Sequence, residues 1–574
     1  MANERLLETV SLRSGPKGNA GPLIFPPASV NVFVGPNHSG KSLLLREIQN
    51  AIQNPEQAHL RKVLKEITFH PLENAKKAAL VDELRGVVRP SPTNPASYIV
   101  LRRAHWSQEL SSSHFEQILK DEIPNLRDVG QNGSLRNYFL SGSFLMLGGA
   151  ERLGILAPTT RESPHGKPRS EAYYNQLLSR LFFLDEKRKT AQAIINDAFH
   201  FHFVINPLGS NFEARISPVA LPPGIERSLC DDAVDFFAQS TAIEQMSDGV
   251  RAYCGMVTAV VASDAKIMLI DEPEAFLHPA LCDKLAQELC RIARTNGQQL
   301  FIATHSAPFL MGCVQAGIDL NIVRLTYQNG AATSRLLPQG ELVPLMRQPL
   351  LRSIGALTGI FYESVVVTES ESDRAFYDEV NHRCLNAHHA SGIPEGLFLN
   401  AQNWQTTARI IAPLRRLGVA AAAIIDIDLL LEGKSEAFQT LVEAAGIPSG
   451  TRTALGQLRG ELHGLLKPLS KELKKMGISC VSDGGRRDLE NLVDQLGKHG
   501  VFVVPVGELE GWLPSLVREA YSNKNEWLLR TFEAMGEDAT HPSYLQPSAG
   551  DVWDFLARVQ AWLRDPIRHG MAQD

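Results

Sequence analysis

The chain has 574 residues, a formal net charge of −6 and 44% hydrophobic residues, which is typical of a globular protein of roughly two to four domains. The acidic balance argues against a nucleic-acid binder with a generally basic surface, although local basic patches remain compatible with it. The N-terminus does not resemble a signal peptide and no apolar run reaches the length of a membrane span, so we expect a cytoplasmic protein with no membrane-spanning segment.

A phosphate-binding loop is predicted near the start of the chain. Residues 35–42 read GPNHSGKS, which fits the pattern G-x-x-x-x-G-K-[ST]. Residues 31–34 predict a buried strand and residues 43–48 the start of a helix, the context in which backbone N–H groups face phosphates. We expect Lys41 to reach the β- and γ-phosphates of ATP and the Ser42 hydroxyl to hold Mg²⁺. The other predicted nucleotide contacts in this loop are Gly35, Asn37 and Gly40.

The interval before the next motif is about 200 residues long, more than a minimal nucleotide-binding fold needs. Residues 163–200 are charged and have helical spacing, which predicts an amphipathic insertion for which subunit pairing is one function to consider. Residues 201–216 alternate around an Asn-Pro-Leu-Gly turn and predict a β-hairpin. Gln108 and Arg152 are the candidates in this interval for an additional residue near the nucleotide.

An unbroken apolar run, residues 267–270, leads into Asp271 and Glu272. Such a run indicates a central parallel strand, which delivers charge to the edge where open α/β sheets bind ligands. We expect Asp271 to bind the Mg²⁺ shell and Glu272 to position and deprotonate the attacking water. Residues 300–304 predict another buried strand, which ends at His305.

Upstream of the acidic strand, Ser247 and Gly249 precede a helical stretch. With the acidic pair and the histidine, this order resembles the ATP-binding-cassette class: Ser-x-Gly is similar to its signature motif, the acidic pair to its Walker B motif and the histidine to its switch histidine. The resemblance implies that Ser247 and Gly249 contact ATP bound by a second subunit, so that a head-to-tail homodimer encloses two ATP molecules. Each motif alone is compatible with a turn or a cap, but their order favours an ATPase.

The pattern restarts after a Pro- and Gly-spaced stretch, so we assign residues 1–345 to an ATPase domain, 346–360 to a linker and 361–574 to a second α/β domain. Three apolar runs in the second domain, at residues 364–368, 420–425 and 501–504, are each followed by carboxylates, and the ends of such strands converge on one edge of a doubly wound sheet. The carboxylates are Glu369 and Asp373, then Asp426 and Asp428, then Glu508 and Glu510.

Convergence of these acids has an electrostatic consequence. Two carboxylates about 4 Å apart repel by about 4 kcal/mol at an effective dielectric near 20, so the cluster must bind protons or cations. Oxygen ligands favour Mg²⁺ or Mn²⁺, and two such ions can activate water and stabilise the leaving oxygen in phosphodiester cleavage. The simpler interpretation of each acid, taken singly, is a helix cap or a solvated loop carboxylate.

The arrangement resembles a Toprim domain, whose pattern is a glutamate after the first strand and Asp-x-Asp after a later one, although Ser370 stands where that pattern usually has glycine. A cassette-type ATPase followed by such a domain resembles the overcoming-lysogenization-defect (OLD) nucleases over nearly the whole chain. The resemblance implies a metal-dependent DNA endonuclease, modulated by ATP and serving bacterial defence against phage, with a dimerising insertion.

The leading hypothesis is therefore an α/β protein with an ATP-binding-cassette-type ATPase domain and a Toprim-like nuclease domain. Its expected partners are DNA, with RNA as the alternative, a second copy of the chain, and a protein or RNA of a defence system. The competing hypothesis is an ATPase sensor or scaffold whose Toprim-like domain is inactive and recruits a partner effector. The expected catalytic residues are Glu272, His305, Glu369, Asp426 and Asp428, and the expected metal ligands are Ser42, Asp271, Glu369, Asp373, Asp426, Asp428 and Glu508.

Two other classes are disfavoured. A chromosome-maintenance ATPase would need a heptad coiled coil in the insertion, and none is present in the sequence. A transporter subunit would give no reason for a second acidic domain. Local basic patches could contact nucleic acid, with solvated helix or loop faces as the simpler interpretation. Their candidate members are Arg102 and Arg103, Arg415 and Arg416, Lys471, Lys474 and Lys475, and Arg486 and Arg487.

Overall fold

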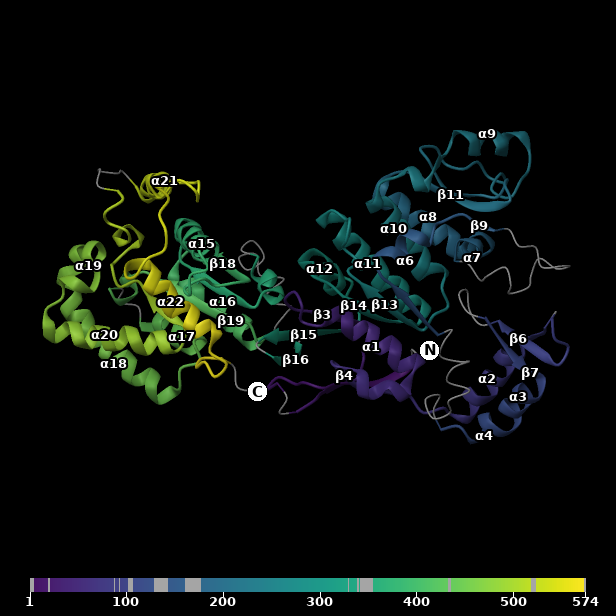
Figure 1. The fold of residues 1–574 in the computed structure, drawn as a ribbon, viewed down its shortest axis with the longest axis horizontal. Coiled ribbons are helices and arrows are strands. Elements are labelled where there is room, and N and C mark those ends of the chain that lie inside the picture. Colours follow the sequence, from purple (N-terminus) through teal and green to yellow (C-terminus); the bar gives the residue numbers. More distant parts are fainter. Residues whose placement is uncertain are drawn as a thin grey trace. The chain divides into compact units, whose positions relative to one another are not determined.

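The computed structural model of the chain describes residues 5–18, 21–86, 88–91, 93–101, 107–127, 143–160, 177–328, 330–337, 340, 355–431, 435–517 and 523–571. The chain divides into two compact units (Figure 1). The first unit comprises residues Met1–Val34 and His38–Leu336, and the second comprises Gly35–Asn37 and Leu337–Asp574. Residues 163–176 of the predicted insertion, residues 346–354 of the predicted linker and the Arg102–Arg103 patch lie outside the described residues.

The first unit is built on a six-stranded sheet with the order β16-β15-β3-β14-β13-β8. Five neighbouring strands, from β15 to β8, run parallel, and the predicted buried strands at 31–34, 267–270 and 300–304 are its centre. Their continuous apolar sequence follows from burial on both faces. The strands are β3 (Val30–Val34), β8 (Phe144–Leu147), β13 (Ile267–Asp271), β14 (Gln299–Ala303), β15 (Leu320–Gln328) and β16 (Ala331–Leu337).

Helices cover both faces of this sheet (Figure 1). One face carries α1, whose Leu44, Leu45 and Ile48 pack in one core with an antiparallel sheet of order β2-β1-β4. The opposite face carries α10, α11 and α12, and every residue from Ala252 to Ala262 of α10 is buried. The elements are β1 (Leu7–Leu12), β2 (Leu23–Phe25), β4 (Leu64–Phe69), α1 (Lys41–Gln53), α10 (Asp248–Ala262), α11 (Pro279–Asn296) and α12 (Ala307–Gln315).

A small lobe with its own apolar core interrupts the first unit between β4 and β8. Its strands pair in the order β5-β6-β7, and the sequence patterns did not predict them. Strands of three to five residues give too few alternations to be recognised by period alone. The elements are α2 (Asn74–Gly86), β5 (Val88–Pro90), β6 (Ser97–Leu101), β7 (Ser107–Ser111), α3 (Ser112–Gln117), the π-helix η2 (Ile118–Glu122) and α4 (Ile123–Asn125).

A second insertion precedes α10. The hairpin predicted at 201–216 is confirmed by the antiparallel pairing of β10 with β11. The described residues of the expected amphipathic segment form α7 and α8. Leu178 and Leu181 of α7 are completely buried inside the unit. The apolar face that these two leucines form is therefore not free to pair with another subunit. The elements are α6 (Gly149–Gly154), β9 (Thr159–Thr160), α7 (Leu177–Phe183), α8 (Asp185–Phe199), β10 (His202–Asn206), β11 (Asn211–Ser217), α9 (Asp231–Gln239) and β12 (Thr241–Ala242).

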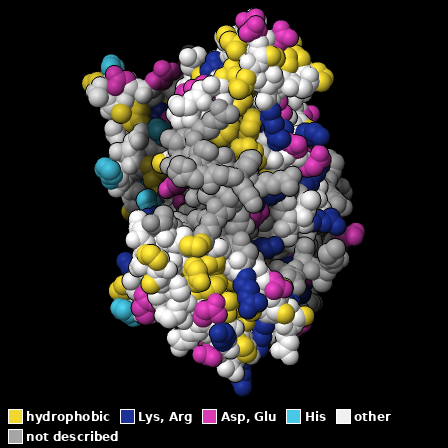
Figure 2. Space-filling model, turned by 90° about the vertical axis from the view of Figure 1, so that its right-hand side faces the viewer, with side chains coloured by type: hydrophobic (Ala, Val, Ile, Leu, Met, Phe, Trp, Pro, Cys, Tyr) yellow, Lys and Arg dark blue, Asp and Glu magenta, His cyan; other side chains and the backbone are white. Residues whose placement is uncertain are grey.

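Exposed apolar side chains of this insertion lie farther along the chain. Val219, Leu229 and Val234 are 64%, 71% and 48% exposed, the last of them on α9. Figure 2, seen from the side of α9, shows apolar side chains gathered in the upper part of this face among scattered charged ones.

The second unit contains a parallel sheet of order β18-β17-β19-β20. The three apolar runs recognised in the sequence are β17, β19 and β20, and β17 and β19 are buried throughout. The elements that matter for the site are β17 (Ser364–Thr368), α15 (Glu371–Asn386), β18 (Gly396–Asn400), α16 (Trp404–Arg416), β19 (Ala420–Ile425), the short helix η6 (Ile427–Leu430), α19 (Ser470–Met476), α20 (Asp483–Lys498), β20 (Val501–Val503), the short helix η9 (Leu509–Gly511) and α21 (Lys524–Met535). The remaining long helices are α17 (Ser435–Ala444), α18 (Ser449–Leu466) and α22 (Asp551–Arg564).

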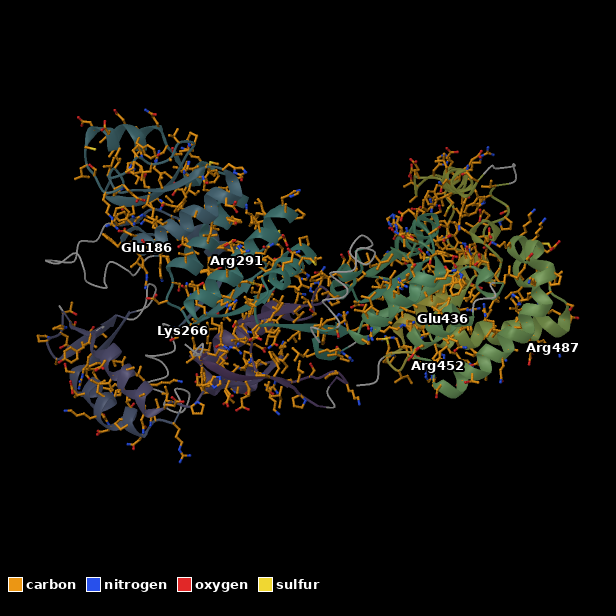
Figure 3. The ribbon with its side chains drawn as sticks, turned by 180° about the vertical axis from the view of Figure 1, so that it is seen from behind. Glu186, Lys266, Arg291, Glu436, Arg452 and Arg487 are labelled. Atoms are coloured by element: carbon orange, nitrogen blue, oxygen red, sulfur yellow. The ribbon has the colours of Figure 1, made fainter. Side chains whose placement is uncertain are left out.

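The basic residues considered from sequence as surface patches of the second unit differ in exposure: Arg416, Lys471, Lys475 and Arg487 are exposed, whereas Arg415 is buried. Arg415 is 2% exposed, and its guanidinium donates to backbone carbonyls of Ala421 at 2.8 Å and His499 at 2.9 Å, among others. These bonds compensate its burial, which lowers the pKa of Arg415 to about 9. Arg486 pairs with Glu490 at 3.1 Å, and Arg487 points to solvent from α20 (Figure 3). Among the described residues, no helix combines the length and the apolar character needed to cross a membrane.

Candidate functional site

The predicted phosphate loop connects β3 to α1. Gly35 and Gly40 have φ angles of 138° and 93°, a region that glycine enters without the steric cost of a Cβ. Lys41 begins α1, is 4% exposed, and donates from Nζ to Ser39 Oγ at 3.1 Å. Burial lowers the pKa of Lys41 to about 8, although Glu272 and neighbouring acids oppose this shift. The loop thus has the glycine-bounded turn and the buried ammonium group that phosphate binding requires.

Asp271, the last residue of β13, lies beside the first turn of α1. Its Oδ1 accepts a hydrogen bond from Ser42 Oγ at 2.9 Å, which joins two residues 229 positions apart. Burial raises the pKa of Asp271, while the bond from Ser42 lowers it. A hydroxyl and a carboxylate in contact are suitable donors for Mg²⁺, so this pair fits the ion that accompanies ATP.

Glu272 has a left-handed backbone conformation, with φ at 49°, which costs about 1–3 kcal/mol for a residue other than glycine. Its backbone N–H donates to Ala303 O at 2.8 Å, and its side chain is 53% exposed. His305 Nε2 lies 3.9 Å from Glu272 Oε1. Burial, reinforced by Lys41, lowers the pKa of His305 to about 4, so the imidazole is neutral at pH 7. A half-exposed carboxylate beside a neutral imidazole can position and deprotonate a water molecule.

Glu274 supports this arrangement and was not recognised as a site residue from sequence. Its Oε1 accepts from the backbone N–H of His305 at 2.6 Å, and its Oε2 accepts from Thr304 Oγ1 at 2.9 Å. Burial raises the pKa of Glu274. The two bonds fix the end of β14 against the segment after β13, and the only sequence signal was a second carboxylate two residues after Glu272.

The signature-like residues stand at the start of α10. Ser247 is the N-terminal cap residue, is exposed, and makes no side-chain capping bond. A Cβ on Gly249 would lie 2.6 Å from Phe276 O, so the close approach of α10 to the segment after Glu272 requires glycine. The Ser247 hydroxyl is therefore presented to solvent from a helix end whose position is fixed.

In the second unit, the ends of the three strands converge as expected. The backbone N–H of Asp426, after β19, donates to Oε1 of Glu369, after β17, at 2.8 Å. The backbone N–H of Ile427 donates to Gly507 O at 3.2 Å, which brings the segment after β20 alongside. The prediction that these acids gather at one edge of the sheet is confirmed.

Ser370, the departure from the expected glycine, has a defined function in the fold. Its hydroxyl accepts from the backbone N–H of Asp373 at 3.3 Å, and its own N–H donates to Asp373 Oδ2 at 2.9 Å. This reciprocal pair is a capping box that starts α15. Ser370 therefore orients Asp373 toward the cluster, and the serine is compatible with the strand-to-helix turn.

Two lysines lie among the carboxylates, and the sequence analysis assigned neither to this site. Lys524 Nζ, at the start of α21, lies 2.8 Å from Asp373 Oδ1 and 3.7 Å from Asp426 Oδ2. Lys474 Nζ, from α19, lies 2.9 Å from Glu508 Oε1 and 3.4 Å from Asp428 Oδ2. Lys474 was considered as part of a basic surface patch, and the structure instead places its ammonium group in the acidic cluster.

The carboxylates of this cluster still carry more negative charge than Lys474 and Lys524 can neutralise. Burial, then Asp426 and Asp428, raise the pKa of Glu369 to about 9. Burial and Asp373 raise the pKa of Asp426 to about 8, although Lys524 opposes this shift. Among the described residues, no three Asp, Glu, His or Cys side chains are already arranged around a metal position. Asp428 Oδ1 and Glu510 Oε2 are buried without a hydrogen-bond partner, so the oxygen donors have capacity for a cation.

A protein-family model described as "AAA domain, putative AbiEii toxin, Type IV TA system" matches residues 30–312, from β3 to α12. This range contains the phosphate loop, the signature-like residues, the acidic pair and His305. Residues 30–312 are an AAA_21 P-loop ATPase domain. No curated protein matches the chain.

Solved structures similar to the chain include two SMC heads and one component of an ABC transporter complex. An Smc head bound to the C-terminal winged-helix domain of ScpA is 13% identical, with 59% of this chain and 99% of that chain covered and a TM-score of 0.32. The SMC head domain from Thermotoga maritima is 13% identical, with coverages of 58% and 99% and a TM-score of 0.28. The cbiO1 protein from Clostridium perfringens, part of an ABC transporter complex, is 14% identical, with coverages of 62% and 99% and a TM-score of 0.27.

Of the two candidates for a further residue near the nucleotide, Arg152 lies at the AAA_21 site. Its Nη1 donates to the backbone carbonyl of Glu272 at 2.6 Å. Gln108 belongs to β7 of the separate lobe, and its side chain lies outside the described part of the chain.

The raised carboxyl pKa values predict that the second unit loses stability as pH rises. In the unfolded chain these groups release their protons near pH 4, whereas Glu369 and Asp426 hold theirs to about pH 9 and 8. Between about pH 4 and pH 9 the unfolded state therefore binds fewer protons than the folded state. The stabilisation that these groups give below pH 4 is lost as pH rises through their folded pKa values.

Thermal unfolding of the full-length protein at pH 5, 7 and 9 in EDTA measures this effect, and the second unit's Tm is expected to fall. Asp426→Asn should flatten the dependence. Asp494→Asn, on the exposed side of α20, is the matched control and should not. An equal slope in wild type and Asp426→Asn would contradict the coupling.

Proposed function

We propose that the chain is an ATP-hydrolysing, divalent-metal-dependent nuclease, with DNA as substrate and internal phosphodiester bonds as the site of cleavage. The observation that carries this proposal is the convergence of buried, electrostatically coupled carboxylates from three parallel-strand ends. A pocket with this excess of negative charge is stabilised by protons or cations, and cations are what phosphodiester hydrolysis uses. The resemblance of the second unit to a Toprim domain, and of the chain to OLD nucleases, supports the same function.

The residues that would hold Mg²⁺ or Mn²⁺ in the second unit share carboxylate chemistry and one edge of the sheet. Bound there, the ions supply a water of lowered pKa and stabilise the leaving oxygen. The Glu369 carboxyl group, anchored by the Asp426 backbone, can hold a proton near neutral pH and transfer it. The proposed ligands are Glu369, Asp373, Asp426, Asp428 and Glu508.

In the AAA_21 domain, we assign ATP phosphate binding to the loop with Gly35, Asn37 and Gly40 and to Lys41. Ser42 and Asp271 would hold the accompanying Mg²⁺, and the half-exposed Glu272 carboxylate would deprotonate the attacking water beside His305. Two features support a homodimer in which Ser247 and Gly249 contact the other subunit's ATP: Ser247 is exposed with no side-chain capping bond, and Gly249 packs closely against Phe276 O.

The matched family's description names a toxin of a toxin–antitoxin system, which supports the proposed function in bacterial defence against phage. A protein or RNA of such a system would then be the regulator of the nuclease.

One observation favours a second function. Lys474 and Lys524 already pair with four of the proposed metal ligands. If these lysines are permanent counter-ions, the second unit does not bind metal, and the protein is an ATPase sensor that recruits a partner effector.

Cleavage of supercoiled plasmid by the full-length protein, with Mg²⁺, Mn²⁺ or EDTA and with or without ATP, separates the two functions. We expect nicked and linear DNA with either metal and at least about 100-fold less cutting in EDTA, because the ions activate the nucleophile. An RNA substrate under the same conditions tests the choice of nucleic acid. Absence of cleavage and of Mn²⁺ binding, with ATP hydrolysis intact, would establish the sensor instead.

A further inference from the structure

A buried arginine of the AAA_21 domain joins two of its functional elements. Arg152 lies on α6, which begins directly after β8, the strand that pairs with β13. Its side chain crosses to the end of β13 and donates to Glu272 O at 2.6 Å, and the residue is only 1% exposed. An arginine buried this completely must have its charge compensated, and the carboxylates of Glu274, Glu272 and Asp271 act on it electrostatically.

The bond from Arg152 acts on a strained backbone. Glu272 holds its left-handed φ of 49° between two hydrogen bonds: its N–H donates to Ala303 O, and its carbonyl accepts from Arg152. Without the second bond, the peptide after Glu272 is free to rotate toward an ordinary conformation. The direction of the Glu272 side chain would change with it, because the Cα–Cβ bond follows φ and ψ.

The backbone of Arg152 packs closely against α10. A Cβ on Gly255 would lie 2.1 Å from Arg152 O, so helix and arginine backbone meet at a distance that only glycine permits. The same helix meets the segment on the other side of Glu272, through Gly249 and Phe276 O. Helix α10, which is capped by the exposed Ser247, therefore contacts two neighbours of Glu272. One is Arg152, which bonds to the Glu272 carbonyl, and the other is Phe276, which follows Glu272 in the chain.

We propose that Arg152 is a positioning residue that couples α10 to Glu272. A shift of α10, when Ser247 and Gly249 engage a second subunit's nucleotide, moves Arg152 and thereby sets the Glu272 carboxylate for water activation. The inference rests on the proposed role of Glu272. Arg152 Nε is buried without a hydrogen-bond partner, so the guanidinium retains a donor with which to adjust during that movement.

The test compares ATP hydrolysis, ATP binding and thermal stability in Arg152→Ala and Arg152→Lys. We expect Arg152→Ala to lower kcat about 100-fold, because a displaced catalytic group loses alignment with the water. The Kd for ATP should stay within about threefold, because Arg152 bonds to Glu272 and not to the phosphate loop. Lysine can restore one hydrogen bond to Glu272 O, so Arg152→Lys should recover at least about tenfold of the loss.

Arg188→Ala is the matched control, because Arg188 is also buried in the first unit but pairs with Glu226 at 2.8 Å, away from β13. It should lower the Tm and leave kcat unchanged. Unchanged kcat in both Arg152 variants would overturn the inference. So would a loss of kcat, ATP binding and Tm together in Arg152→Lys, because that pattern indicates packing alone.

Glu272→Gln separates this inference from the proposed function. If Glu272→Gln hydrolyses ATP normally, the proposed role of Glu272 fails, whatever Arg152 does. If Glu272→Gln is inactive and the Arg152 variants are normal, only the coupling fails. Adding Arg152→Ala to Glu272→Gln should cause no further loss, because both changes remove the same step.

Discussion

Glu272→Gln is expected to lower ATP turnover by at least about 100-fold while ATP binding is retained. The substitution keeps the shape of the side chain and removes its ability to accept a proton from water. The bonds of Lys41 to Ser39 Oγ and of Ser42 to Asp271 Oδ1 do not involve the substituted side chain, so these groups should still bind the nucleotide. Turnover is measured by phosphate release, and binding by titration with a fluorescent ATP analogue.

The proposed dimer adds a second readout to this variant. ATP that binds but is not hydrolysed should hold two copies together, so Glu272→Gln with ATP should elute as a dimer during gel filtration. Glu186→Gln is the control, since Glu186 lies on the surface of α8 with its side chain 89% exposed (Figure 3). Its turnover should equal that of wild type. Normal hydrolysis by Glu272→Gln would remove Glu272 from the mechanism.

Asp426→Asn is expected to lower DNA cleavage by at least about 100-fold, because it removes the charge of a proposed metal ligand at the centre of the cluster. The same change relieves electrostatic repulsion in a buried site, where the pKa of Asp426 is raised to about 8. The Tm at pH 8 should therefore be equal to or higher than that of wild type. This combination of lower activity and retained stability cannot result from misfolding.

Plasmid nicking with Mn²⁺ and calorimetric Mn²⁺ titration measure the two effects of Asp426→Asn. Asp494→Asn carries the same chemical change on the exposed surface of α20 and should cut and bind Mn²⁺ normally. Equal cutting by Asp426→Asn and wild type would show that the cluster is not the nuclease site. ATP hydrolysis should be unaffected in both variants, since the proposed ATP-hydrolysing residues belong to the AAA_21 domain.

Elements with a continuous local pattern were predictable. The phosphate loop is a single run between a strand and a helix, and β3 and α1 occupy the expected places. The acidic strand ends were also predictable, because apolar runs of strand length must be buried and parallel strands deliver their ends to one edge. The lobe of residues 74–127 was missed, since its strands are short and its helices weakly patterned.

Helical spacing alone did not show what covers the apolar residues of the insertion for which dimerisation was considered. Leu178 and Leu181 have the spacing of an amphipathic helix, and that spacing does not identify which surface covers the apolar side. In the structure the rest of the first unit covers it. Exposed apolar side chains lie instead near α9, in a segment without helical periodicity before residue 231.

The chemistry of this chain was readable wherever neighbouring residues carry it: a lysine and serine after two glycines, or acids after an apolar strand. The long-range polar contacts were not predictable, because their partners come from distant parts of the chain. Lys474 pairs with the Asp428 carboxylate across 46 positions, and Arg152 donates to the backbone carbonyl of Glu272 across 120. No period or motif records such contacts, since they form only when separate helices pack against a completed sheet and burial forces each charge to find an opposite one.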